Sequence, residues 1–389
     1  MAKYLLMNGD LRVMAFYHEL TEIGNSFSDF IIELPELLPP VLRKSDNISY
    51  AMTDWVERRT IPVNRHHMEA VLGAVNLENR FDILRYSHGL SLNDTYWIQA
   101  EIENLSFDSI NLYDNPFDEA LGWIAFTGLP GNISRNLSSP EFTTEGMLPK
   151  YWQRLTTDNI ILCKGGTEGY SNAGLEPFAE VISWLIAKRI DINTIPYHLD
   201  QRNDKPVSIS KLFTTKETGL LTANQYLVEA YPGYSTISLE MALAQMQKDF
   251  TDLRPFYSMC FFDHIIENGD RHLNNWGFSI ENATRKIKCF APLWDNGAAL
   301  YYERAEDMRK RFNFASFNIR YDFIKSCQYR RELAAKARSL IAAIGDGRLE
   351  KDCMEAVSGY ERYEARVKPT LAFVESRCRE FIAGIGEED

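Results

Sequence analysis

The sequence predicts an α+β protein in three parts: a β-rich N-terminal subdomain, a mixed α/β lobe and a mainly helical C-terminal lobe. Short alternating segments separated by turn residues fill the first part. A buried strand followed by an apolar helix defines the second, and helical periodicity dominates the third. We place the three parts at 1–125, 126–216 and 217–389.

Composition excludes several classes of protein. The 389 residues are 45% hydrophobic and 25% charged, as in an ordinary globular protein. A net charge of -12 argues against nucleic-acid binding by the chain alone. No apolar run reaches the ~18 residues of a membrane span, and the N-terminus lacks a signal-peptide core, so we expect a cytoplasmic protein that does not bind membranes. The six cysteines form no C-x-x-C pair, which predicts neither disulfides nor a zinc site.

The N-terminal part begins with short strands. Residues 4–38 alternate in polarity around Asn8, Gly9 and Asp10, which predict a tight hairpin turn. Pro39 and Pro40 end this run. A loop rich in Ser, Asn, Gly and Pro, residues 129–142, leads to the second part.

The second part contains a lysine at the end of a predicted strand, followed by a glutamate in the next predicted helix. The apolar segment 159–164 predicts a buried strand that ends in Lys164. The helix after it tolerates Pro177 in its first turn and carries Glu176 and Glu180. Kinases use a strand lysine paired with a helix glutamate to hold the α- and β-phosphates of ATP. We choose Glu180, which lies further into the helix, since Glu176 is also explained as a first-turn acid favoured by the helix dipole.

Two further strands follow this helix, and the second of them leads into a hinge between the lobes. The segment 205–213 has the apolar content of a strand. Lys211 and Phe213 stand at its end, where we predict that they contribute to the nucleotide site.

The most informative stretch is 256–275, an apolar helix that runs into a polar loop. Gly269 stands where a helix ends in a left-handed residue, so we expect the helix to stop there. Asp270 follows directly, Asn275 comes five residues later, and Asp295 precedes Asn-Gly after a predicted hairpin. In kinases an Asp accepts the proton of the attacking hydroxyl, and an Asn five positions on and a later Asp hold Mg²⁺. We assign these roles to Asp270, Asn275 and Asp295.

These motifs, in this order, resemble the HipA-like serine/threonine kinases, which include the toxins of bacterial toxin–antitoxin pairs. The similarity covers about residues 120 to 380. It rests on Thr143, Gly146 and Lys150 in a phosphate loop, the strand lysine Lys164, the helix glutamate Glu180, the catalytic-loop residues Asp270, His272 and Asn275, and the metal ligand Asp295. The chain departs from the family pattern at Pro149, Arg271 and Asn274.

The resemblance implies a bilobal protein-kinase-like fold, ATP and Mg²⁺ as cofactors, and transfer to serine or threonine of a protein whose identity the sequence does not reveal. It also implies self-phosphorylation at Thr143 and a small helix-turn-helix antitoxin as partner. Thr144, Ser138 and Ser139 are rival acceptors, and Thr143 is equally well explained as a turn hydroxyl bonded to its own backbone. Two other functions stay open: a pseudokinase or repressor-type binding module, and a kinase for a small molecule or lipid headgroup.

Overall fold

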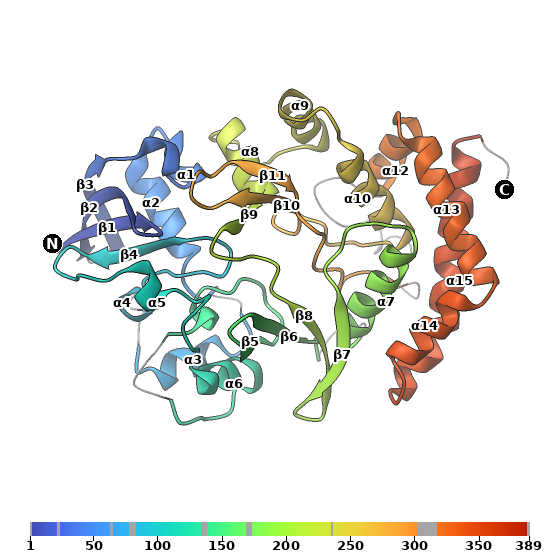
Figure 1. Cartoon of the computed structure of the whole chain (residues 1–389), viewed down its shortest axis with the longest axis horizontal. Coiled ribbons are helices and arrows are strands. Elements are labelled where there is room, and N and C mark those ends of the chain that lie inside the picture. The colour runs from blue at the N-terminus through green and yellow to red at the C-terminus, as the bar shows by residue number, and fades with distance from the viewer. Residues whose placement is uncertain are drawn as a thin grey trace.

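The computed structural model describes residues 2–21, 24–62, 65–77, 83–133, 138–168, 173–234, 236–301 and 317–386. Three antiparallel sheets follow one another along the chain. In Figure 1 the N-terminal sheet lies at one end of the molecule, the second sheet near the middle and the last helices at the other end. The fold is therefore α+β, as predicted.

The N-terminal sheet has the order β3-β2-β1-β4. Its strands are β1 (Ala2–Asn8), β2 (Leu11–Thr21), β3 (Gly24–Ile32) and β4 (Tyr96–Ala100). Asn8 pairs with Leu11, so Gly9 and Asp10 form the predicted hairpin turn, and Gly9 has the positive φ of 57° that such a turn requires.

Short helices pack around this sheet and lead to the second lobe. They are η1 (Pro35–Leu37), α1 (Pro40–Arg43), α2 (Ile48–Glu57), α3 (Met68–Ala74), α4 (Leu84–Ser87), α5 (Phe107–Ile110) and α6 (Glu119–Thr127). Met52 and Val56 of α2 bury their side chains against Leu6 and Phe16 of the sheet. Helix α6 contacts both α3 and the first strand of the second sheet, so the boundary placed at residue 125 falls inside a helix that joins the two parts.

The second sheet has the order β5-β6-β8-β7. Its strands are β5 (Lys150–Thr156), β6 (Asn159–Gly165), β7 (Tyr197–Arg202) and β8 (Lys205–Lys211). Helix α7 (Glu176–Arg189) packs on β7 and β8 and is covered on its other side by C-terminal helices. This explains why it is buried on nearly every side and not along one stripe. The predicted order of strand, helix, strand and strand is confirmed.

The C-terminal lobe combines a small sheet with a helical layer. The sheet, of order β11-β10-β9, contains β9 (Thr218–Thr222), β10 (Gly277–Glu281) and β11 (Ile287–Phe290), and β10 and β11 form the predicted hairpin. The helices are α8 (Ala223–Ala230), α9 (Leu239–Asp249), α10 (Arg254–Ile265), α12 (Phe317–Ser326), α13 (Arg330–Gly345), α14 (Arg348–Ala356) and α15 (Glu361–Gly384). Among the described residues, no helix has the length and apolar character of a membrane span.

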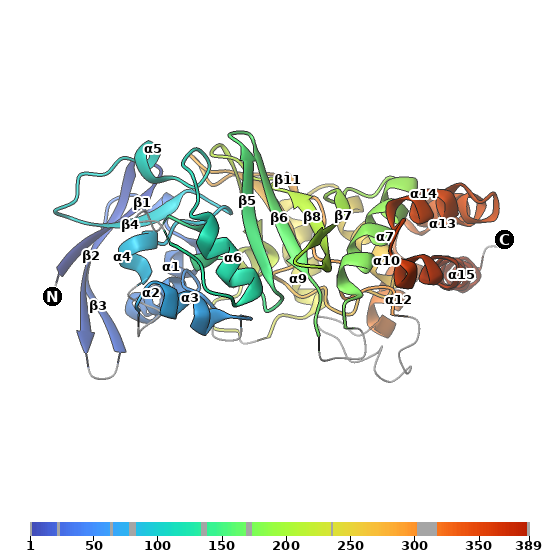
Figure 2. The ribbon, with the colours of Figure 1, turned by 90° about the horizontal axis from the view of Figure 1, so that it is seen from below.

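The largest hydrophobic core joins α7 to this helical lobe. The apolar residues of α10 that the sequence placed against a core are buried, among them Phe256, Met259 and Cys260. Figure 2 shows α7 and α10 between the β5–β8 sheet and the layer of α13, α14 and α15. A rigid helix therefore supports the loop that begins after α10.

The N-terminal subdomain contacts the C-terminal lobe directly. Arg43 of α1 forms an ion pair with Glu229 of α8 at 3.0 Å. The buried side-chain amide of Asn8 donates to the carbonyl of Asn282 at 2.9 Å. The subdomain thus spans from the second sheet to the helical lobe.

Candidate active site

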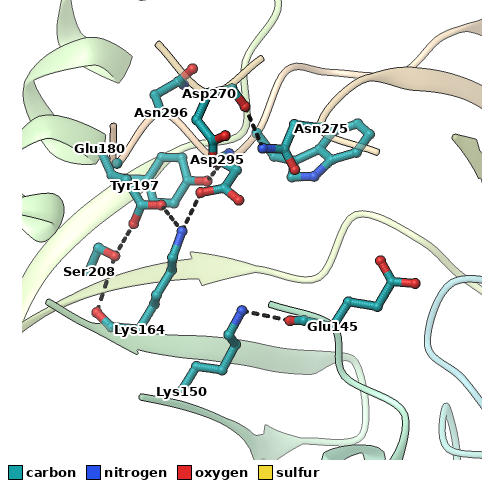
Figure 3. A network of polar contacts seen from close by, with 12 residues as sticks. Glu145, Lys150, Lys164, Glu180, Tyr197, Ser208, Asp270, Asn275, Asp295 and Asn296 are labelled. Atoms are coloured by element: carbon teal, nitrogen blue, oxygen red, sulfur yellow. Dashed lines mark hydrogen bonds and ion pairs between the residues drawn. The ribbon is translucent and has the colours of Figure 1, made fainter. Parts of the chain in front are cut away.

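Strand β6 places Lys164 at the centre of a polar cluster (Figure 3). Lys164 lies opposite Lys150 of β5 on one side and Ser208 of β8 on the other. Its ammonium contacts Glu180 Oε1 at 2.7 Å and also pairs with Asp295. A strand, a helix and a loop distant in sequence thus meet at one nitrogen atom.

Glu180 lies beside Lys164, and Glu176 does not share this role. The second carboxylate oxygen of Glu180 accepts a hydrogen bond from Ser208 Oγ, which fixes the carboxylate from its other side. Glu176, one turn earlier in α7, instead accepts from the hydroxyl of Thr167 at 2.7 Å. The structure therefore separates the two acidic residues that the helix offers.

The helix before the catalytic loop ends earlier than expected. Helix α10 stops at Ile265, and Glu267, with φ of 47°, is the left-handed residue in place of Gly269. The cause is a backbone bond from Asn268 N to Asp263 O at 2.9 Å, which closes the last turn. The side chain of Asn268 then accepts from Asp270 N at 3.0 Å and fixes the start of the loop.

Asn275 lies next to Asp270 because the loop turns back on itself. Its side-chain amide donates to the carbonyl of Asp270 at 2.8 Å, which leaves the amide oxygen of Asn275 free to act as a ligand. His272 N donates to the same carbonyl at 2.9 Å. The three predicted catalytic-loop residues are brought together within one short turn.

Arg271 binds this loop to the segment that carries Asp295. Its guanidinium is 1% exposed and forms an ion pair with Asp263 of α10 at 3.0 Å. One nitrogen donates to Asn275 O at 2.8 Å and to Trp294 O at 2.6 Å, and another donates to the side chain of Asn296. Sequence reasoning noted Arg271 only as a departure from the family pattern. Two of its four acceptor groups are backbone carbonyls, which leave no signal in a sequence.

Asp295 has a strained backbone at the point where the site converges. Its φ is 56°, a conformation that costs a non-glycine residue free energy. Residues with such strained backbones are concentrated at functional sites. Its N–H donates to the hydroxyl of Tyr197 at 3.1 Å. Tyr197 and Ser208 are contributors that the motif analysis missed, and polar residues within the strands of a buried sheet are the signal that could have found them.

The pKa values of the two aspartates of the cluster, Asp295 and Asp270, shift in opposite directions. Burial opposes the charge on Asp295, but the ammonium groups of Lys164 and Lys150 outweigh it and lower the pKa of Asp295 to about 2. At Asp270 burial raises the pKa, His272 opposes the rise and Asp295 adds to it. The surroundings therefore favour the anionic form of Asp295 and the protonated form of Asp270.

The loop predicted to bind phosphate, which contains Gly146 and Lys150, follows η3 (Pro140–Phe142). Lys150 Nζ turns back and donates to the carbonyl of Glu145 at 2.6 Å. Gly146 has φ of 92°, a backbone conformation that L side chains rarely adopt, which explains glycine at this position. Burial, with repulsion from Lys164, lowers the pKa of Lys150 to about 7.

The remaining predicted residues lie around this core. The ring of Phe213 packs against Trp294, the neighbour of Asp295, with centroids 5.8 Å apart. Lys211 is the last residue of β8 and is exposed. The hydroxyl of Thr143 is buried and donates to Leu90 O at 2.7 Å, so it faces the N-terminal subdomain.

Comparisons with known proteins identify the fold. No protein-family model and no curated protein matches the sequence. The Helicobacter pylori proinflammatory kinase CtkA aligns over 62% of this chain and 90% of its own, with 17% identity and a TM-score of 0.44. HipA of Shewanella oneidensis MR-1, solved in a complex with HipB and operator DNA, aligns over 99% of this chain and 100% of its own, with 12% identity and a TM-score of 0.60. The chain has a HipA-like fold.

The HipA-like fold extends over the whole chain and includes the N-terminal subdomain, which the motifs did not reach. Because the identity is low, the likeness concerns the arrangement of elements. The role of each side chain therefore rests on the contacts described above. Among the described residues, no group of three His, Cys, Asp or Glu side chains is arranged to hold a metal ion. A cation would use Asp295 together with amide and solvent oxygens.

Proposed function

We propose that the chain is an ATP- and Mg²⁺-dependent serine/threonine protein kinase of HipA-like type. The observation that supports this best is the contact of Lys164 with both Glu180 and Asp295. A lysine held between a helix glutamate and a metal-binding aspartate is the arrangement by which kinases hold ATP phosphates.

The residues fit the nucleotide and its metal. Lys164 and Lys150 offer two ammonium groups on neighbouring strands for the phosphates. Asn275 and Asp295 offer an amide oxygen and an anionic carboxylate, the oxygen donors that Mg²⁺ prefers. The bound metal would neutralise charge that develops on the phosphoryl group.

Asp270 supplies the base. Its carboxylate takes the proton of the acceptor hydroxyl as the hydroxyl oxygen bonds to the γ-phosphorus and the bond from that phosphorus to the leaving ADP oxygen breaks. The raised pKa of Asp270 brings it closer to the range useful for this transfer. Asn275 holds the loop backbone at Asp270 while this occurs.

We also propose Thr143 as the site of self-phosphorylation. In this conformation its hydroxyl is engaged by Leu90 O, so the loop must move before Thr143 can act as an acceptor. Two of the three rival hydroxyls also form hydrogen bonds: that of Thr144 donates to Pro140 O at 2.7 Å, and that of Ser139 accepts from Glu141 N at 3.2 Å.

A partner of the antitoxin type is proposed by analogy with the complex that HipA forms. The solved HipA is bound to HipB and operator DNA. Because this chain has a net charge of -12, contact with DNA would depend on a basic partner. Co-expression with the product of an adjacent gene, followed by size-exclusion chromatography, tests for such a complex.

Incubation of purified protein with Mg-ATP and a cell extract, followed by phosphoproteomics, tests the function. Wild type should phosphorylate serine or threonine, and Lys164→Met should not, because the phosphate ligand is lost. Lys205→Met, which removes an exposed lysine of β8, is the matched control and should retain activity. Nucleotide binding without transfer would favour a pseudokinase. Transfer only to metabolites or lipids would favour the small-molecule alternative.

A further inference from the structure

The phosphate loop is held from outside its own lobe. Arg65 belongs to the N-terminal subdomain, and its guanidinium is 1% exposed. Nη1 donates to Glu141 O at 2.7 Å and to Thr144 O at 3.0 Å. Nη2 donates to Lys150 O at 3.0 Å and forms an ion pair with the Glu141 carboxylate. A single side chain thus contacts the start, the middle and the end of the loop.

This contact bears directly on the nucleotide side of the loop. Arg65 fixes the backbone of Lys150, whose ammonium turns toward Glu145 O and lies on the strand beside Lys164. Residues directly opposite each other on antiparallel strands share a face of the sheet, so Lys150 and Lys164 face the same space. Displacement of the Lys150 backbone would therefore displace a phosphate ligand.

The same subdomain holds the proposed acceptor. The hydroxyl of Thr143 donates to Leu90 O, also in the N-terminal subdomain. The carboxylate of Glu141 accepts from Trp152 N at 2.7 Å as well as from Arg65, so the anchor continues into β5. Both ends of this contact are buried, and removing one partner of a buried ion pair leaves the other uncompensated.

We infer that Arg65 is a positioning residue through which the N-terminal subdomain holds the phosphate loop over the nucleotide, and that loss of this contact releases the loop and weakens ATP binding. The inference rests on the proposed kinase function. An arginine is required because four acceptors lie around one planar group. A lysine ammonium has three donors and no fork.

Arg154 provides a matched control. This half-buried arginine of β5 also joins the second lobe to the N-terminal subdomain, through Tyr113 O at 2.8 Å and Leu112 O at 2.6 Å. Its guanidinium donates to Tyr113 O, Leu112 O and Thr157 O, and none of these acceptors belongs to residues 141–150, so its loss tests subdomain docking without touching the phosphate loop.

Full-length Arg65→Met, Arg65→Lys and Arg154→Met variants test the inference by hydrogen exchange and by calorimetric titration with Mg-ATP. Both Arg65 variants should speed exchange in residues 141–150 and weaken Mg-ATP binding, by at least about tenfold in Arg65→Met and by less in Arg65→Lys. Arg154→Met should leave both within about twofold of wild type. Equal losses in Arg65→Met and Arg154→Met, or unchanged loop exchange in Arg65→Met, would overturn the inference.

Two further measurements allow the inference to be tested even if Arg65→Met does not fold or wild type does not bind Mg-ATP. If Arg65→Met does not fold, Arg65→Lys and Glu141→Gln make the same contact weaker without removing a side chain, and they should show the same changes at smaller size. If wild type fails to bind Mg-ATP, the kinase proposal fails, while the exchange of residues 141–150 still decides whether Arg65 holds the loop.

Discussion

Two buried arginines hold the two loops of the site, and they do so in different ways. Arg271 binds the catalytic loop to Asp263, Trp294 and Asn296, all within its own lobe and within 25 residues of it in sequence. Arg65 binds the phosphate loop from another subdomain, to acceptors 76 to 85 residues away.

This difference means that the loop proposed to carry the catalytic base and the loop proposed to bind the phosphates depend on different parts of the molecule. The loop that carries Asp270 folds with its own lobe and depends on that lobe's stability. The loop that carries Lys150 depends on a neighbouring subdomain and is thus open to release while the core stays folded. The expected effects of substitution should divide along the same line.

The largest loss of activity should follow from Asp270→Asn. Phosphoryl transfer should fall by ~10² to 10⁴, because a general base is lost and no phosphate contact is removed. Mg-ATP affinity should remain near that of wild type in calorimetry. Turnover close to normal would show that Asp270 is not the base. The loop held by Arg271 would then have no demonstrated catalytic role.

Arg271→Met should cost about 3–5 kcal/mol of unfolding free energy, because it breaks the buried ion pair with Asp263. Urea titration measures this cost. The double variant Arg271→Met/Asp263→Leu should recover part of it, since the buried carboxylate of the ion pair is removed as well. If Arg65→Met speeds hydrogen exchange in residues 270–275 as much as in residues 141–150, the two loops are not held differently.

Asp295→Ala should weaken binding of ATP at least about tenfold when Mg²⁺ is present and much less when it is chelated. The reason is the loss of an anionic metal ligand. Asp346→Ala removes an exposed carboxylate in the C-terminal lobe and serves as the control. Equal weakening with and without Mg²⁺ would indicate that Asp295 acts only through its ion pair with Lys164.

The smallest effect should be a pH dependence that belongs to Lys150. Its pKa of about 7 in the free protein means that the ammonium is present below that pH and lost above it. ATP phosphates favour the charged form, so binding should take up a proton, and affinity should fall by up to about tenfold per pH unit above 7. Calorimetry in buffers of different ionisation enthalpy measures the uptake. Lys150→Met should abolish it and Lys205→Met should preserve it.

The sequence was most informative where function is local. The five-residue spacing from Asp270 to Asn275 follows from a single turn, and a strand that ends in Lys164 is visible as an apolar run. The order of strand, helix, strand and strand along the chain and the hairpin before Asp295 were predictable for the same reason. Each of these features is determined by residues that are close together in the sequence.

Features that depend on backbone acceptors were not predictable. Arg65 binds three carbonyl groups, and any residue at those positions would supply the same oxygen atom. The burial of Thr143 against Leu90 O is likewise a tertiary contact without a motif. The error at Gly269 has a related cause, because a backbone bond to Asp263 O ended the helix before the glycine was reached.

The contacts of Arg43 with Glu229 and of Asn8 with Asn282 have a kinetic consequence. In a two-lobed enzyme, the product nucleotide is commonly released when the lobes open, and product release often limits turnover. Here the N-terminal subdomain ties the helical lobe to the lobe that carries the phosphate loop, so a wide swing would break both contacts. We expect ADP to depart past the phosphate loop instead, with a residence time that follows the loosening of Arg65 and not the separation of the lobes.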